Sequence, residues 1–328
     1  MQSFLFPPRR AAIAVALGSA LGLAGCMSLA PDHERPPAPV AAVCPDAPAA
    51  PADAARAADI PWQRFIEDAR TARLVELALA NNRDLRIATL NVERTRAQYR
   101  IQQADQWPTL GVNASATRQH MGAAPLASQY FVGLGVSAFE LDLFGRVRSL
   151  SDAALAQYFA TDEGRKAAQI ALVGAVARAQ LALQADDELI ALTEQTLRTR
   201  NESQRLTQLR FDNGVVSELD LQQSLSLTSS ARATLAALQR QRRLDENALV
   251  LLLGQPLPSD LPPAQPLSQL RFADLPAGLP SELLDRRPDI RQAEQQLRAA
   301  NANIGAARAA FFPRISLTAT AGSLSDNL

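Results

Sequence analysis

The sequence predicts a mixed α and β fold, in which long antiparallel helices are combined with strands of the length that crosses a bilayer. Three observations support this: a stretch of 63 residues without proline at 149–211, segments of about ten residues with apolar alternation, and an internal repeat. Long helices exclude proline from their interiors, and period-2 alternation is typical of strands with one apolar face.

The composition excludes several classes of protein. Lysine plus arginine and aspartate plus glutamate number 33 each, so no net positive field attracts nucleic acid. The apolar fraction is 47%, but only 5% of the residues are aromatic, so alanine and leucine supply most of the hydrophobicity. This profile favours long, thinly packed helices over a bulky globular core. With only two cysteines, the chain has no disulfide framework.

The N-terminus has the layout of a bacterial export signal. Arg9 and Arg10 precede an apolar run at 11–24, which is shorter than the ~20 residues of a membrane-spanning helix. The run ends in Leu-Ala-Gly-Cys, which resembles a lipobox and implies that Cys26 is lipidated and becomes the first residue after cleavage. The alternative is an ordinary signal peptide with a chance cysteine. Position 27 is Met27 rather than aspartate, so no inner-membrane retention signal is evident.

Residues 31–61 predict an extended tether, because eight prolines and eleven alanines build no core. Cys44 lies in this segment as an unpaired thiol to which we assign no role. Two helices are then expected, at 62–82 and at 84–106, and Pro108 blocks continuation of the second.

Two alternating segments follow and predict a β-hairpin. Apolar residues occupy every second position of both: Leu110, Val112, Ala114 and Ala116 in the first, and Tyr130, Val132, Leu134, Val136 and Ala138 in the second. Each segment has the length with which a tilted strand spans a bilayer. An isolated two-stranded hairpin is only marginally stable, so these strands must pair with others.

The longest predicted helix covers about 149–211, roughly 95 Å at ~1.5 Å per residue. An Asn-Gly pair that includes Gly214 ends it, and a second helix covers about 217–253 with Gly254 as its C-terminal stop. So short a connection makes the two helices antiparallel. A lone hairpin of this length has little core, so we expect lateral neighbours from copies of the same chain.

The end of the sequence repeats an earlier part. Residues 82–116 align without a gap to residues 287–321, at an offset of 205. The matched pairs include residues of the helix and of the strand: Asp84 with Asp289, Arg86 with Arg291, Trp107 with Phe312, and Pro108 with Pro313. The repeat predicts a tandem architecture. A complete second unit would extend to about residue 458, so we expect about 130 further residues.

The sequence offers few residues for catalysis. His33 and His120 are too few for the usual metal or triad site. The segment GLGVSA at 133–138 loosely matches a dinucleotide fingerprint, but it lies inside an alternating strand. The acidic residues at 186–188 and the arginines within 240–243 are interpreted as solvated helix surface. We therefore expect no enzyme.

Three segments carry a family resemblance: FELDLFGR at 139–146, LRFDNGVVSELDLQQS at 209–224 and LPSELLDRRPDIRQAEQQLRAANANIGAARAAFFPRISLTATAG at 279–322. From Cys26 onward the chain resembles the outer-membrane factor family of tripartite efflux pumps, and within it the OprM-like, NodT-type lipoproteins. The resemblance implies a trimer in which each protomer gives four strands to an outer-membrane β-barrel and two long antiparallel helical hairpins to a periplasmic α-barrel. With three of four strands, we expect this exact chain not to form a stable barrel.

The resemblance also implies a function. It implies an outer-membrane channel subunit of an RND-type efflux system that exports drugs or other small compounds. The implied partners are two further copies of the chain, a periplasmic adaptor (membrane fusion) protein, an inner-membrane pump and outer-membrane lipid, with no nucleic acid. No cofactor is expected other than covalent lipid on Cys26. The family's gate residues belong to a hairpin that this sequence does not include.

The resemblance places adaptor docking at the turn between the two long helices. Phe211, Gly214, Val215 and Ser217 occupy the matching positions. A glycine permits the tight turn, and an exposed pair of valines beside a small hydroxyl offers an apolar contact. The alternative is that this segment is only a helix-breaking turn.

The predicted segments follow from these observations. They are a signal peptide at 1–25, a lipidated tether at 26–61, equatorial and upper helices at 62–107, a strand hairpin at 108–141, a long helical hairpin at 142–253, a connector at 254–285 and the start of a second repeat at 286–328. Two other functions stay open: a periplasmic structural or adaptor-type lipoprotein that conducts nothing, and a partial gene product without function.

Overall fold

The computed structural model of the chain describes residues 28–35, 60–120, 127–273 and 286–326. These residues form two compact units. The strand unit contains the described residues of 1–37, 90–164 and 288–328, and the hairpin unit contains those of 38–89 and 165–287. The predicted signal peptide, Cys26 and most of the predicted tether lie outside the described residues.

The hairpin unit begins with two helices where the sequence predicts one. α2 spans Trp62–Phe65 and α3 spans Ala69–Asn81. Asp68 causes the break, because its carboxylate caps α3. It accepts hydrogen bonds from the backbone N–H of Thr71 at 2.8 Å and from the Thr71 hydroxyl at 2.6 Å. The prediction of one continuous helix is therefore wrong at this point.

A single asparagine fixes the start of α4, which spans Arg83–Ala104. The side-chain oxygen of Asn82 accepts a hydrogen bond from the N–H of Leu85 at 2.8 Å. Its side-chain nitrogen donates to the carbonyl of Leu252 at 2.8 Å. The buried Asn82 therefore caps one helix and ties it to another, because Leu252 lies far along the chain.

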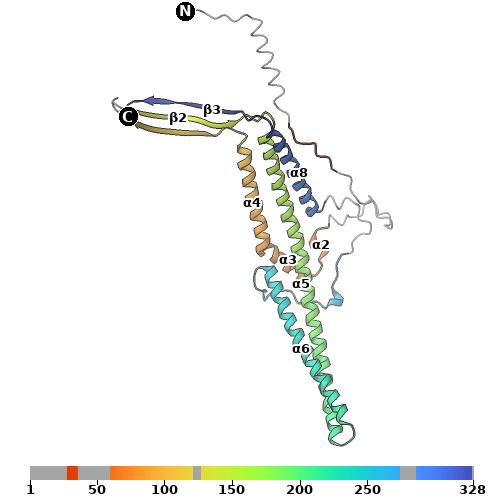
Figure 1. Ribbon diagram of the computed structural model, residues 1–328. Coiled ribbons are helices and arrows are strands. Elements are labelled where there is room, and N and C mark those ends of the chain that lie inside the picture. Colours follow the sequence, from red (N-terminus) through yellow and green to blue (C-terminus); the bar gives the residue numbers. More distant parts are fainter. Residues whose placement is uncertain (1–27, 36–59, 121–126, 274–285, 327–328) are drawn as a thin grey trace, which may run out of the picture. The chain divides into compact units, whose positions relative to one another are not determined.

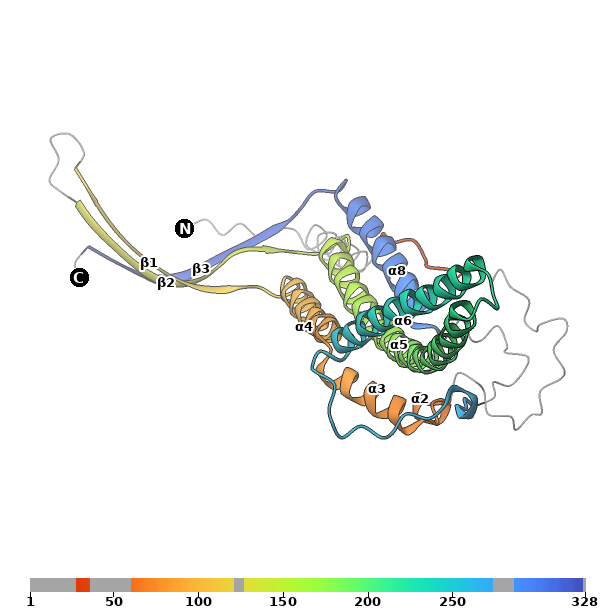
Figure 2. The same cartoon turned by 90° about the horizontal axis from the view of Figure 1, so that it is seen from below.

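The two long helices are confirmed. α5 spans Arg146–Asp212 and α6 spans Glu218–Leu253, within three residues of the predicted bounds. α5 starts earlier than predicted because the carboxylate of Asp142 accepts a hydrogen bond from the N–H of Arg148 at 2.7 Å. Figure 1 and Figure 2 show the hairpin-unit part of α5 running antiparallel beside α6 as far as their turn.

The core of the hairpin unit lies between α3, α5 and α6. Its buried side chains are all aliphatic: Ile66, Leu74, Val75, Ala78, Leu172, Val176, Leu183, Leu249 and Leu253. Gly254 ends α6 with a φ of 70°, and a Cβ on it would lie 2.4 Å from the carbonyl oxygen of Asn81. Both the backbone angle and the close approach require glycine, so the predicted helix stop is confirmed.

The connector after α6 returns to the first helices of the unit. It contains a short 3-10 helix, η2, at Leu267–Gln269. Phe272 bridges to Ile66 through the backbone, and its ring centroid lies 5.6 Å from that of Phe65. In the part of the chain that the structure describes, no helix combines the length and apolarity needed to cross a membrane.

The strand unit contains one antiparallel sheet in the order β1-β2-β3. β1 spans Leu110–Gln119, β2 spans Ala127–Glu140 and β3 spans Ser316–Ser325, and the three lie side by side in Figure 1 and Figure 2. The predicted hairpin is confirmed. The sequence left the partner of the last strand open, and the structure pairs it with β2.

The register gives the sheet two chemically different faces, because directly paired residues share a face. The apolar face includes Leu110, Val112, Ala114, Val132, Leu134, Val136, Ala319 and Ala321. The polar face includes Gly111, Asn113, Ser115, Thr117, Gly133, Gly135, Thr320 and Gly322. A register shift between Val136 and Phe139 removes Ala138 from the predicted alternation.

The internal repeat is visible as two matching helix-strand pairs. α8 spans Pro288–Ala309 and leads into β3, as α4 leads into β1. Both helices have 22 residues, and their bounds differ by the offset of 205 read from the sequence. β3 begins one residue later than this offset places it.

Residues 28–35, which we call the strap, run along α8 within the strand unit. Two strap carbonyls accept hydrogen bonds from α8 side chains, and Arg35 forms an ion pair with Glu294 at 2.6 Å. The approach is closest at Gly305, where a Cβ would lie 2.8 Å from Ala30. The strap therefore packs directly against the backbone of α8 at Gly305, where the helix has no side chain.

Candidate functional site

The turn between α5 and α6 contains all four residues predicted for docking. The N–H of Gly214 donates to the carbonyl of Phe211 at 2.9 Å, and the N–H of Val215 donates to the carbonyl of Arg210 at 2.8 Å. This pair of hydrogen bonds is a Schellman motif, which satisfies the last carbonyls of α5. Gly214 has a φ of 69° and no atom within 4 Å of a Cβ position, so the backbone angle alone requires glycine.

Ser217 has a local structural role in this turn. It is the N-cap of α6, and its hydroxyl oxygen accepts a hydrogen bond from the N–H of Asp220 at 3.2 Å. The carboxylate of Asp220 in turn accepts from the N–H of Ser217 at 3.1 Å and from its hydroxyl at 2.7 Å. These hydrogen bonds hold the pKa of Asp220 below its ordinary value. The spacing Ser-x-x-Asp is a capping-box signal that the sequence reasoning missed.

The turn exposes apolar side chains, and most of the charged residues around them are acidic. Val215 is 70% exposed and Leu219 is 66% exposed, whereas Phe211 and Val216 are half-buried, so only one valine of the predicted pair is exposed. Between residues 209 and 220 the chain carries three acidic side chains and one arginine. Leu219 belongs to the exposed apolar group but was not predicted. Its place in the first turn of α6, four residues after the predicted valine, is the signal that could have identified it.

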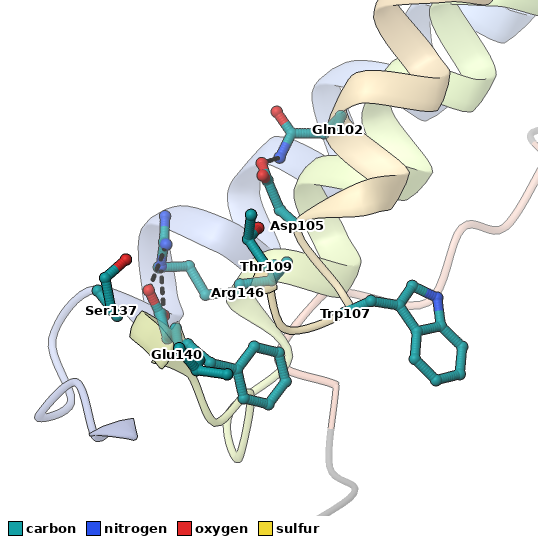
Figure 3. A pocket seen from close by; sticks show the side chains of 11 residues that line it. Gln102, Asp105, Trp107, Thr109, Ser137, Glu140 and Arg146 are labelled. Carbon is teal, nitrogen blue, oxygen red and sulfur yellow. Dashed lines mark hydrogen bonds and ion pairs between the residues drawn. The ribbon is translucent and has the colours of Figure 1, made fainter. Parts of the chain in front are cut away.

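A pocket lies inside the strand unit, at the junction of β2 with the start of α5. It is a cavity of about 220 Å³ lined by residues that include Gln102, Asp105, Trp107, Glu140 and Arg146 (Figure 3). Arg146 donates two hydrogen bonds to the carboxylate of Glu140, at 2.8 and 2.6 Å, and they raise the pKa of Arg146. In Figure 3, Trp107 points away from this ion pair. None of the predicted site residues lies here.

The prediction of a solvated helix surface at 186–188 is confirmed for Asp187 and Glu188, which are exposed, and is wrong for Asp186. Asp186 is only 8% exposed. Asp187 pairs with Arg242 of α6, which also pairs with Glu246 at 2.7 Å. Glu188 accepts a hydrogen bond from the N–H of Leu267 at 2.8 Å. These carboxylates hold α5 to α6 and to the connector.

Metal binding finds no support in the described ranges. Within 28–35, 60–120, 127–273 and 286–326, no three histidine, cysteine, aspartate or glutamate side chains are grouped so as to hold a metal ion. Cys26, the predicted lipidation site, lies outside these ranges.

Comparison with known proteins identifies one family. The family described as "Outer membrane efflux protein" matches residues 74–255 and 279–327. The chain is 49% identical over 316 residues to the toluene efflux pump outer membrane protein TtgC of Pseudomonas putida, covering 93% of this chain and 65% of that protein. It is 47% identical over 321 residues to the outer membrane protein OprJ of Pseudomonas aeruginosa, covering 95% of this chain and 67% of OprJ.

Solved structures of similar sequence have the same fold as this chain. A membrane protein from Pseudomonas aeruginosa superposes with a TM-score of 0.79 at 45% identity, over 92% of this chain and 69% of that one. The open state of the MtrE outer membrane channel of Neisseria gonorrhoeae superposes with a TM-score of 0.78 at 37% identity, over 92% and 73%. The chain therefore spans about two thirds of the length of these relatives.

Proposed function

Because this chain belongs to the outer membrane efflux protein family, we propose that it is the outer-membrane channel subunit of a tripartite efflux system. The observation that carries the proposal is the exposed apolar face of the sheet. Val112 is 75% exposed and Val132 is 59% exposed, on strands whose opposite face is polar. In water such a face is unfavourable, whereas in a bilayer it faces lipid.

The proposed assembly is a homotrimer in the outer membrane. β1 and β3 are the outer strands of the described sheet, and their free backbone groups must be paired by other strands if the sheet lies in lipid. The thin aliphatic core between α3, α5 and α6 likewise leaves the rest of the long hairpin in need of lateral neighbours. Lipidation of Cys26 adds a second attachment to the membrane.

The proposed partners act at the α5–α6 turn. A periplasmic adaptor protein would contact the exposed pair Val215 and Leu219, with an apolar surface rimmed by basic groups to match the acidic residues of the turn. An inner-membrane pump would deliver the exported compound through that adaptor. The names of relatives refer to toluene, solvent and antibiotic efflux, so we propose small apolar compounds as substrates. The proposal contains no catalytic step.

Membrane retention tests the proposal directly. We expect a Cys26→Ser variant to stay in the membrane after carbonate extraction at high pH, because the sheet itself is held in lipid. Adding Val112→Asp, which places a charge on the apolar face, should release most of the protein, since a charged side chain on the lipid-facing side destabilises a membrane-spanning strand.

Asn113→Asp is the matched control, because it adds the same charge at the neighbouring position on the polar face. It should leave retention unchanged. Release of the Cys26→Ser variant by carbonate would instead favour a lipid-tethered periplasmic protein whose strands do not enter the bilayer.

A further inference from the structure

The polar face of the sheet is interrupted by an apolar pair. Phe131 is directly paired with Ser115 on one side and with Leu324 on the other, so all three share the polar face. In the part of the chain that the structure describes, Phe131 is the one aromatic residue that the strand register places on this face. Leu324 is 60% exposed beside it.

The ring of Phe131 lies along the sheet rather than away from it. A Cβ on Gly133 would lie 2.7 Å from its Cζ atom, and a Cβ on Gly322 would lie 2.8 Å from its Cε2 atom. Gly133 and Gly322 are directly paired, so the two glycines form one notch across β2 and β3. One side of the ring packs on these two glycines. The opposite side of the ring is therefore directed away from the sheet.

We propose that Phe131, with Leu324, is an apolar contact site for planar aromatic solutes on the water-filled wall of the channel. The inference rests on the proposed function, since the polar face lines the channel only if the apolar face meets lipid. Around the pair, the polar face carries glycine, serine, threonine, asparagine and glutamine residues, and the polar side chains among them bind water. A trimer would present three such sites.

The apolar side chains of Phe131 and Leu324 determine which solutes this site can bind. A phenyl ring stacks on other aromatic rings and on apolar groups but offers no hydrogen bond to a hydrated ion. The neighbouring leucine extends the apolar area without adding a polar group. The site should therefore retain planar aromatic solutes briefly and leave small hydrated ions unaffected.

Single-channel recording with a charged aromatic probe tests the inference. Benzylammonium added to a potassium chloride solution should reduce the single-channel current, whereas methylammonium, which lacks the ring, should not. In the Phe131→Ala variant the benzylammonium concentration needed for half block should rise by about two- to tenfold, the range of one aromatic contact. Tyr130→Ala is the matched control, because Tyr130 is the adjacent aromatic residue and lies on the opposite face of the sheet. The benzylammonium concentration needed for half block should be the same in this variant as in the unchanged protein.

An equal half-block concentration in Phe131→Ala and the unchanged protein would overturn the inference and leave the proposed function standing. An unchanged protein that conducts no current would agree with the expectation that three strands form no stable barrel, and it would overturn both the proposed function and this inference. If Phe131→Ala does not assemble, cysteine labelling decides instead. In a Cys44→Ser background, Phe131→Cys should react with a hydrophilic thiol reagent and lose current, and Val132→Cys should not. Equal labelling of the two would overturn the inference.

Discussion

Asp186 shows how burial and charge conflict at a single residue of the hairpin unit. Burial is the main cause that raises its pKa, followed by a hydrogen bond to Asp245 and by the charges of Asp245 and Asp187. Arg242 opposes these effects, but it is already paired with Asp187 and Glu246. One oxygen of Asp186 is buried and makes no hydrogen bond. At neutral pH this carboxylate therefore destabilises the contact between α5 and α6.

Replacing Asp186 with asparagine should increase the free energy of unfolding at pH 7, because the neutral amide avoids the burial penalty and the charge repulsion that raise the pKa of the carboxyl. The folded-state pKa is raised, so the wild-type chain gains stability as the pH falls through that pKa toward the ordinary value of the unfolded carboxyl. The advantage of the variant should shrink over this window. Urea denaturation followed by helical circular dichroism, at pH 7 and at acid pH, measures both effects.

Glu194→Gln is the control for this prediction, because it removes an exposed carboxylate from the same helix. It should change the free energy of unfolding by less than about 0.5 kcal/mol at either pH. A pH-independent effect of Asp186→Asn would show that the carboxylate is solvated.

At the scale of elements, two helical glycines have opposite roles. A Cβ on Gly305 of α8 would clash with Ala30 of the strap, whereas one on Gly174 of α5 would meet no atom within 4 Å. Alanine is otherwise favoured over glycine in a helix interior by about 1 kcal/mol. Glycine at position 305 therefore lowers the stability of α8 relative to alanine, but it leaves the space in which the strap packs.

Gly305→Ala should loosen the strap, and cleavage after Glu34 by a glutamyl endopeptidase should become several-fold faster. Gly174→Ala should leave this cleavage rate unchanged and stabilise the chain slightly. The rate of appearance of the cleaved product, followed by mass spectrometry on the membrane-embedded protein, measures the difference. Equal cleavage rates in the two variants would contradict the role assigned to Gly305.

The elements that the sequence predicted best are those with local signals. The bounds of α5 and α6 follow from missing prolines and from Gly214 and Gly254. The break at Asp68 was missed because one capping side chain overrides an otherwise helical pattern. The pairing of β3 with β2 was left open because strand partners distant in sequence leave no local trace.

The candidate site was predicted in part for the same reason. The turn at Gly214 is a local feature, so its position and conformation were correct. The hydroxyl of Ser217 was assigned to docking, but within the chain it is engaged in capping α6. Docking itself stays a prediction, because a contact with another protein is not encoded in local backbone geometry.

At the scale of the whole molecule, the sheet joins the two repeats. β1 and β2 belong to the first copy and β3 belongs to the second, yet β2 pairs with both of its neighbours, with β1 through a continuous ladder and with β3 through a ladder that has one register shift. The polar and apolar faces therefore continue from one repeat into the next. This continuity is what allows a channel wall to be extended by strands of other copies in the proposed trimer.

The proposed docking of an adaptor would involve the assembled trimer, and variants of the α5–α6 turn test it. Val215→Asp combined with Leu219→Asp should weaken co-purification with the adaptor by about tenfold or more and lower drug resistance in cells, because both exposed apolar contacts become charged. Val215→Ile keeps an apolar contact and should behave as the unchanged protein. Normal adaptor binding by the double variant would exclude the turn as the docking site.

Because β2 pairs with β3, the sheet cannot be completed until β3 has been synthesised. Tyr130 pairs with Ser325, so nearly two hundred residues must be made between the two strands. At ~5–20 residues per second, β2 waits roughly 10 s or longer for its partner. During that interval the residues of β1 and β2 have no third strand to pair with, and their apolar side chains stay exposed. The nascent chain therefore needs protection from aggregation until the second repeat arrives.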